Sequence, residues 1–313
     1  MSIVVNPSSR AEQWMTALTE LLPDETLYLW PQVGEPTEVE YVLAWQMSAD
    51  DLVGFTNLST VFSLGAGVDQ WMPLFDDDRL QDIRIVRLVD PAMSDEMAAY
   101  ALHWVLHYQR RFDQMAALQQ QRQFTQPDCI EAAEFTIGIL GYGNIGRRVG
   151  DAFSHLGYPI NAWSRTVRHD QPDPNVTHYA GLDELDGFLG ASQAVINVLP
   201  NTADTAGVLD AKRLAAFADG ALFVNMGRGT VVRESDLLNA LDKGPLRVAV
   251  LDVTEPEPPP STSDLFDHPN VRLTGHSAGA TSISSASKLI AANIGRLRRG
   301  DDPFPILDPS RGY

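Results

Sequence analysis

The feature that most constrains the fold is a glycine-rich turn between a strand pattern and a helix pattern. An apolar run at residues 135–140 leads directly into Gly-Tyr-Gly-Asn-Ile-Gly at residues 141–146, and apolar residues then recur at helical spacing to Leu156. In a strand-turn-helix unit, the first glycine permits the tight bend, the second lets a pyrophosphate approach the backbone, and the third lets the helix pack against the strand. The alternative is a glycine-rich turn that only packs against a helix and binds nothing. The order of strand, glycine turn and helix favours a dinucleotide-binding site instead. The candidate residues are Gly141, Tyr142, Gly143, Asn144, Ile145 and Gly146.

Short apolar runs alternate with helix patterns along the rest of the chain. In the first part they lie at residues 3–5, 27–30, 41–45, 61–64 and 83–88, with a helix near 11–22. In the second part, six strand-like runs lie at residues 135–140, 159–163, 194–199, 221–226, 247–253 and 271–274. Such alternation is typical of parallel sheets with helices on both faces. The sequence therefore predicts an α/β fold with two Rossmann-like, doubly wound parallel-sheet domains and a cleft between them.

The predicted domains are not both continuous in the sequence. We expect a substrate domain formed by residues 1–95 and 285–313, and a dinucleotide-binding domain formed by residues 96–284. Residues 94–123 contain no Gly or Pro and carry apolar residues at helical spacing, which predicts one long helix. A final helix is expected near residues 283–297, and the proline-containing tail after it should return to the first domain.

Composition excludes several classes of protein. The 313 residues include 23 Lys and Arg against 41 Asp and Glu, a net charge of -18, which argues against a nucleic-acid-binding face. Cys129 is the only cysteine, so no intramolecular disulfide can form, and we expect a cytoplasmic protein. No run approaches the ~18 apolar residues of a membrane span, so no membrane partner is expected.

The segment expected to meet the adenosine ribose carries arginine where an acidic residue is usual. After the strand at residues 159–163 come Ser164, Arg165, Thr166 and then Arg168. An acidic side chain there would repel a ribose 2'-phosphate, whereas the planar guanidinium of Arg165 can bind it through several donors. Solvent-facing arginines are common on loops, yet the sequence favours NADPH as the cofactor, with NADH still possible.

Charged groups follow three successive strand patterns in the second half. Arg228 lies between two glycines after one strand, Glu255 and Glu257 follow the next, and His276 follows the last. Because the carboxyl ends of parallel strands meet at one edge of a sheet, these groups are expected to converge there. An arginine, an acid and a histidine together are typical of a catalytic site.

We expect no metal site. His103 and His107 are four residues apart on a predicted helix, but the residue after the first is Trp104, where a zinc protease motif has Glu. Helix packing at an interface is the better interpretation. The acidic run at residues 76–78 is expected to be solvated surface.

The order of these segments, with the Leu-Gly-Ala-Gly-Val-Asp run at residues 64–69, resembles the D-isomer-specific 2-hydroxyacid dehydrogenases over essentially the whole chain. The resemblance implies that Arg228 clamps a substrate carboxylate and polarises its keto oxygen, that His276 donates a proton to that oxygen, and that Glu257 orients the imidazole and keeps it protonated. Glu255 is the rival for this last role. Members of the family often have proline where this chain has Gly275, which leaves the rigidity of that loop open.

The same resemblance implies further site residues. Gly65, Ala66 and Gly67 would offer backbone N–H groups to the substrate carboxylate, and Trp45 and Met93 would form walls of the pocket. Additional motifs that carry the resemblance lie at residues 163–165, 199–202 and 311–313. The remaining implied cofactor contacts are Leu199, Pro200, Thr205, Met226, Gly227, Asp252 and Ala278.

The activity implied by the resemblance is NADPH-dependent reduction of small 2-keto acids, glyoxylate to glycolate and hydroxypyruvate to D-glycerate. One alternative is a member of the family that acts on a bulkier acid such as phenylpyruvate. Another is a binding protein that senses NAD(P)H on the same fold without turnover. A homodimer built partly on the helix predicted at residues 94–123 is also implied.

Overall fold

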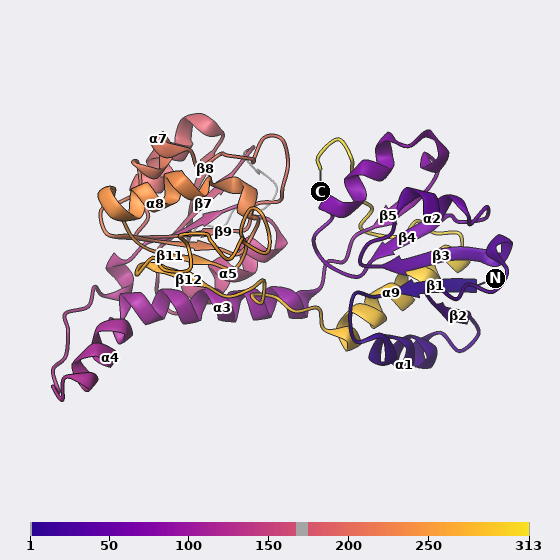
Figure 1. The fold of residues 1–313 in the computed structure, drawn as a ribbon, viewed down its shortest axis with the longest axis horizontal. Helices are drawn as coiled ribbons and strands as arrows, with labels where there is room; N and C mark the ends of the chain where they lie inside the picture. Colours follow the sequence, from indigo (N-terminus) through magenta and orange to yellow (C-terminus); the bar gives the residue numbers. More distant parts are fainter. Residues whose placement is uncertain (1, 167–174, 313) are drawn as a thin grey trace. The chain divides into compact units, whose positions relative to one another are not determined.

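The chain divides into two compact units, each built on its own parallel sheet. The computed structural model describes residues 2–166 and 175–312. One unit is Met1–Met93 with Thr281–Tyr313, and the other is Ser94–Ala280 (Figure 1). Both sheets are parallel throughout and carry helices, so the predicted α/β fold class is confirmed. Among the described residues, no helix combines the length and the apolar character needed to cross a membrane.

The first unit is a five-stranded sheet in the order β2-β1-β3-β4-β5. Its principal elements are β1 (Ser2–Asn6), α1 (Ala11–Leu21), β2 (Thr26–Leu29), β3 (Val39–Ala44), α2 (Ala49–Val53), β4 (Thr60–Ser63), β5 (Arg84–Val86) and α9 (Ile283–Arg298). Successive side chains of a strand point to opposite faces, so Ile3 and Val5 pack in the core that contains residues of α1 and α9, whereas Val4 packs in the core that contains Leu52 of α2. Both faces are therefore buried, which explains the continuous apolar runs of these strands.

The C-terminal tail pairs with the edge strand of the first unit. The N–H of Leu307 donates to the carbonyl of Ile85, the N–H of Arg87 donates to the carbonyl of Pro305, and Val86 forms an antiparallel bridge with Ile306. The tail thus returns to the first unit, as the sequence predicts.

The second unit is a seven-stranded sheet in the order β12-β11-β10-β9-β6-β7-β8. Its strands are β6 (Ile137–Leu140), β7 (Ile160–Ser164), β8 (Val176–Ala180), β9 (Ala194–Asn197), β10 (Ala221–Asn225), β11 (Leu246–Leu251) and β12 (Val271–Leu273). Its helices are α3 (Pro91–Gln109), α4 (Phe112–Gln120), α5 (Asn144–Ser154), α6 (Leu185–Gly190), α7 (Ala211–Leu214) and α8 (Glu234–Lys243), and the unit boundary falls in the first turn of α3. From β6 the chain adds β7 and β8 on one side of the sheet and then β9 to β12 on the other side, so the order of strands changes between β6 and β9. Ligands of such sheets bind at this point, beyond the carboxyl ends of the strands.

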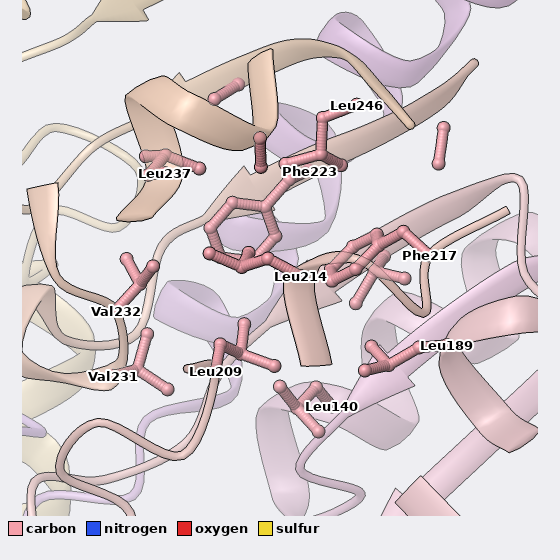
Figure 2. Packing of buried hydrophobic residues seen from close by; sticks show 14 of the residues in the cluster. Leu140, Leu189, Leu209, Leu214, Phe217, Phe223, Val231, Val232, Leu237 and Leu246 are labelled. Atoms are coloured by element: carbon pink, nitrogen blue, oxygen red, sulfur yellow. The ribbon is translucent and has the colours of Figure 1, made fainter. Parts of the chain in front are cut away.

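One core of the second unit lies between the sheet and the helices α6, α7 and α8. Figure 2 shows Phe223 of β10 among Leu189, Leu214 and Leu237, which come from these three helices. The ring of Phe223 also meets that of Phe217 edge to face, with 5.9 Å between centroids. This packing fixes β9, β10 and β11, whose carboxyl ends carry the candidate catalytic loops.

Two predictions about elements are wrong in detail. The helix predicted at residues 94–123 is two helices, α3 and α4, because Arg111 adopts a left-handed conformation with φ of 59° that ends one helix and begins the next. The second sheet has seven strands instead of six, because β8 joins its edge beside β7.

Candidate active site

The glycine-rich turn connects β6 to α5, and each of its glycines has its own structural reason. Gly141 has a φ of 105°, which side chains rarely tolerate. A Cβ on Gly146 would lie 2.0 Å from the carbonyl oxygen of Gly141, so only glycine lets α5 approach the turn this closely. A Cβ on Gly143 would meet nothing within 4 Å, so the space above this residue at the start of α5 is open to a ligand. The turn therefore fits a bound pyrophosphate.

The side chains at positions 142 and 165 lie in different surroundings. Tyr142 is buried at 4% exposure and its ring meets that of His178 edge to face, so its side chain contributes to packing. Arg165 follows β7, is exposed, and forms an ion pair with Asp204, 3.0 Å between Nη1 and Oδ2. Ser164 Oγ donates to the carbonyl of Thr166. Arg168 and the terminal Tyr313 lie outside the described residues.

Two buried asparagines hold the loop that carries Arg228. Asn197 ends β9 and donates through Nδ2 to Oδ1 of Asn225, which ends β10, at 2.8 Å. Nδ2 of Asn225 in turn donates to the carbonyl of Arg228 at 3.0 Å. A Cβ on Gly227 would lie 2.8 Å from the carbonyl of Leu199, and one on Gly229 would lie 2.1 Å from Thr254. The backbone around Arg228 is thus fixed between the loops after β9 and β11.

His276 and Glu257 form a close pair in the loops after β12 and β11. Nδ1 of His276 lies 2.6 Å from Oε1 of Glu257, and both side chains are partly exposed. Of the two acids at residues 255 and 257, Glu257 makes this contact, and it uses Nδ1 of the imidazole, not Nε2. The sheet order β12-β11-β10 places the loops of His276, Glu257 and Arg228 side by side at the carboxyl edge.

The loop of His276 has an unusual backbone. Gly275 has a φ of 64° and His276 a φ of 56°, both in the left-handed region. Proline fixes φ at about -65°, so a proline at position 275 could not adopt this turn. Left-handed histidine is uncommon and persists where the surroundings hold it in place.

Asp252 supplies that support from beneath the loop. This residue follows β11 and is 3% exposed. Its Oδ1 accepts hydrogen bonds from Thr274 Oγ1 at 2.6 Å and from the N–H of Ser277 at 2.7 Å, and its Oδ2 accepts from the N–H of Ala278 at 2.9 Å. Its carbonyl accepts from the N–H of His276 at 2.7 Å. The carboxylate therefore fixes the loop that carries His276, and its contact with a cofactor stays a prediction.

In the first unit, Trp45 and the glycine loop at residues 65–67 lie against each other. The Trp45 indole lies where a Cβ on Gly65 would stand, 2.1 Å from the nearest ring atom, so only glycine at this position leaves room for the indole. Gln70 Nε2 donates to the carbonyls of Trp45 at 2.8 Å and Gly67 at 3.2 Å, which ties the two segments together. The N–H of Gly65 donates to Ser63 Oγ at 3.4 Å, which leaves the N–H groups of Ala66 and Gly67 for a carboxylate.

The other predicted contacts lie in ordered loops of the second unit. Thr205 Oγ1 donates to the carbonyl of Pro200 at 2.7 Å, which closes the loop after β9. The side chains of Leu199, Met226 and Ala278 are buried. Met93, the predicted wall residue, is buried as well, but it lies in the first turn of α3 and belongs to the first unit. The contacts of these residues with a ligand stay a prediction.

The described residues contain no group of three or more His, Cys, Asp or Glu side chains arranged to hold a metal ion. His103 and His107 stack on each other with 6.1 Å between ring centroids and pack against Trp104. They form part of an aromatic face of α3.

Comparison with known proteins identifies the family. The family model for the D-isomer specific 2-hydroxyacid dehydrogenase NAD-binding domain matches residues 102–278. Glyoxylate/hydroxypyruvate reductase A from Salmonella paratyphi B is 37% identical over 314 residues, covering 99% of both chains. The chain belongs to the D-isomer-specific 2-hydroxyacid dehydrogenase family. Its closer resemblance to glyoxylate/hydroxypyruvate reductase A, carried by Trp45 and the motifs at residues 64–69, 163–165, 199–202 and 311–313, is confirmed as well.

Solved structures of this family superimpose over the whole chain. A D-isomer-specific 2-hydroxyacid dehydrogenase from Xanthobacter autotrophicus, in complex with NADPH and MES, is 34% identical with a TM-score of 0.91, covering 100% of this chain and 99% of that one. The NADPH-dependent glyoxylate/hydroxypyruvate reductase from Sinorhizobium meliloti, in complex with NADP and sulfate, is 29% identical, also with a TM-score of 0.91, and both chains are covered completely.

Sequence reasoning missed three residues that position this dehydrogenase site. Asn197 and Asn225 are fully buried at strand ends, and a buried asparagine after an apolar strand is the signal that could have pointed to them. Tyr100 of α3 has its hydroxyl 2.7 Å from Thr274 Oγ1. Burial raises the pKa of Tyr100 to about 12, so its hydroxyl keeps its proton and donates to Thr274, which itself donates to Asp252.

Proposed function

We propose that this protein is an NADPH-dependent reductase of small 2-keto acids, with glyoxylate and hydroxypyruvate as its preferred substrates. The observation that carries the proposal is the His276–Glu257 pair, held by Asp252 in the loop next to that of Arg228. A proton donor beside a fixed cation is what reduction of a keto group next to a carboxylate requires. The 37% identity to glyoxylate/hydroxypyruvate reductase A over 99% of both chains supports the substrate assignment.

Each catalytic residue then has a defined role. The Arg228 guanidinium binds the substrate carboxylate and polarises the keto oxygen. Nε2–H of His276 donates its proton to that oxygen as negative charge develops there, and Glu257 fixes the imidazole through Nδ1–H. NADPH supplies the hydride that reaches C2 of the keto acid.

Both units contribute binding residues, and Arg228, which binds the substrate carboxylate, belongs to the second unit. We assign cofactor binding to Ser94–Ala280, with the pyrophosphate at residues 141–146 and the 2'-phosphate at Arg165. In the first unit, the N–H groups of Ala66 and Gly67 bind the substrate carboxylate and Trp45 forms a wall. The indole closely covers the Gly65 backbone, so this wall would lie directly against the glycine loop.

An assay of purified protein with NADPH or NADH and a panel of 2-keto acids tests this function. We expect loss of reduced cofactor with glyoxylate and hydroxypyruvate, a higher kcat/KM with NADPH than with NADH, and weaker turnover of phenylpyruvate. Faster turnover of phenylpyruvate would assign the chain to bulkier substrates. No turnover of any acid, with NADPH still bound, would indicate a cofactor-sensing binding protein.

We also propose a homodimer in which α3 and α4 contribute to the contact. No residue of α4 is buried, and the helix stands away from the sheet of its own unit (Figure 1). Phe112, Phe124 and Ile130 expose apolar side chains around it, while Asp113 anchors its start through an ion pair with Arg247. Exposed apolar surface of this kind is typical of a contact between chains.

Light scattering coupled to size exclusion measures the assembly directly. We expect a mass of about twice the chain mass of 34.4 kDa. Substitution of Phe112 and Phe124 by glutamate should shift this mass towards that of one chain, because charge is costly at an apolar contact. A single-chain mass for the wild type would contradict the homodimer.

A cytoplasmic location is the last part of the proposal. Cys129 is the only cysteine of the chain, and proteins without disulfides are usual in that reducing compartment. Recovery of the NADPH-dependent activity in the cytoplasmic fraction of expressing cells tests it.

A further inference from the structure

The ion pair between Arg165 and Asp204 spans the edge of the sheet at the glycine-rich turn. Arg165 follows β7 and Asp204 lies in the loop after β9, and both strands pair with β6, one on each side. The three strands are parallel, so their carboxyl ends share the edge from which the turn at residues 141–146 begins. Asp204 therefore reaches the same guanidinium that the proposed function assigns to the 2'-phosphate.

The loop after β9 holds Asp204 in this position. Thr205 Oγ1 donates to the carbonyl of Pro200 at 2.7 Å and accepts from the N–H of Thr202 at 2.9 Å. The N–H of Thr205 also donates to the carbonyl of Thr202. These bonds close a compact turn directly beside Asp204, so its carboxylate is presented to Arg165 by an ordered segment.

We propose that Asp204 is a cofactor-selectivity residue, whose carboxylate competes with the 2'-phosphate of NADPH for Arg165. The inference rests on the assignment of Arg165 in the proposed function. A 2'-phosphate carries nearly two negative charges, so the phosphate displaces the carboxylate of Asp204 from the guanidinium of Arg165. The displaced carboxylate stays nearby and still repels the phosphate. NADH has a 2'-hydroxyl at that position and leaves the ion pair intact. Asp204 thus lowers the ratio of NADPH affinity to NADH affinity below the ratio that Arg165 would give without this carboxylate.

The test is the dissociation constant of each reduced cofactor, measured by nicotinamide fluorescence for the wild type and Asp204→Asn. At an ionic strength of about 0.01 M, we expect Asp204→Asn to bind NADPH about three- to tenfold more tightly, because an exposed carboxylate close to the phosphate is removed. NADH affinity should stay near the wild-type value. The gain for NADPH should shrink at about 0.5 M salt, where charges further apart than a few ångströms are screened.

Asp186→Asn is the matched control. Asp186 of α6 is also a partly exposed carboxylate in the second unit, and it pairs with Lys212 at 3.1 Å. The substitution changes the net charge equally, so an equal gain in NADPH affinity would show a general charge effect and overturn the role of Asp204. Unchanged or weaker NADPH binding by Asp204→Asn would also overturn it.

Arg165→Ala separates failure of this inference from failure of the cofactor assignment. If Arg165→Ala weakens NADPH binding while Asp204→Asn has no effect, Arg165 binds the phosphate and only the competition is wrong. If Arg165→Ala leaves NADPH affinity unchanged, the 2'-phosphate binds elsewhere, and both statements fail.

Discussion

Replacing His276 with alanine is expected to lower kcat for glyoxylate reduction by about 100- to 10,000-fold, because the variant lacks the proton donor for the keto oxygen. In the structure, Nδ1 of His276 lies 2.6 Å from Oε1 of Glu257, so the proposed function assigns the proton donation to Nε2. Affinity for NADPH should stay near the wild-type value, since the glycine-rich turn lies on a different strand. Steady-state kinetics at saturating NADPH measures kcat, and nicotinamide fluorescence measures the cofactor affinity.

His268→Ala is the matched control for this prediction. Nε2 of His268 also contacts a carboxylate, that of Asp242 at 3.2 Å, but His268 precedes β12 whereas His276 follows it. It therefore lies at the opposite edge of the sheet, and its loss should leave kcat close to the wild-type value. Thermal melting of both variants separates loss of folded protein from loss of chemistry. A kcat near wild type for folded His276→Ala would mean that another group delivers the proton.

The parts of the site that depend on local backbone geometry could be predicted from the sequence. The strand pattern, the glycines and the helix pattern follow one another without a break at residues 135–156. Their spacing therefore predicted the turn, the tight bend at Gly141 and the close approach of the helix at Gly146. The succession of strand ends likewise predicted that Arg228, an acid and His276 share one edge. The family resemblance already favoured Glu257 over Glu255 as the partner of His276, but residue spacing alone did not separate the two acids; the structure adds the 2.6 Å contact between Glu257 and His276.

Features that depend on distant partners could not be predicted. Asn197 and Asn225 bond across two strands, and neither carries a sequence motif. β8 lies at the sheet edge with only Val176 buried, so its polar residues gave no strand pattern. The break between α3 and α4 falls at Arg111, where neither Gly nor Pro marks it.

Replacing Arg228 with alanine is expected to lower kcat/KM for glyoxylate by about 100- to 1,000-fold, because the substrate carboxylate loses its positioned guanidinium. The net charge of -18 disfavours anions in general, so a carboxylate substrate depends on a local, positioned cation such as Arg228. Arg228→Lys should recover only part of the loss, because an ammonium keeps the charge without the planar pair of donors. The measured quantities are kcat and KM for glyoxylate at saturating NADPH.

Two further measurements decide whether Arg228 acts on the substrate. Added guanidinium ion should restore part of the activity of Arg228→Ala, because it can occupy the space that the side chain left, whereas a merely structural arginine would not be replaced in this way. Arg233→Ala is the matched control: Arg233 is an exposed arginine just before α8, and its removal changes the charge equally. If Arg228→Ala lowers NADPH affinity as much as it lowers kcat/KM, Arg228 binds the cofactor. Another residue would then have to bind the substrate carboxylate.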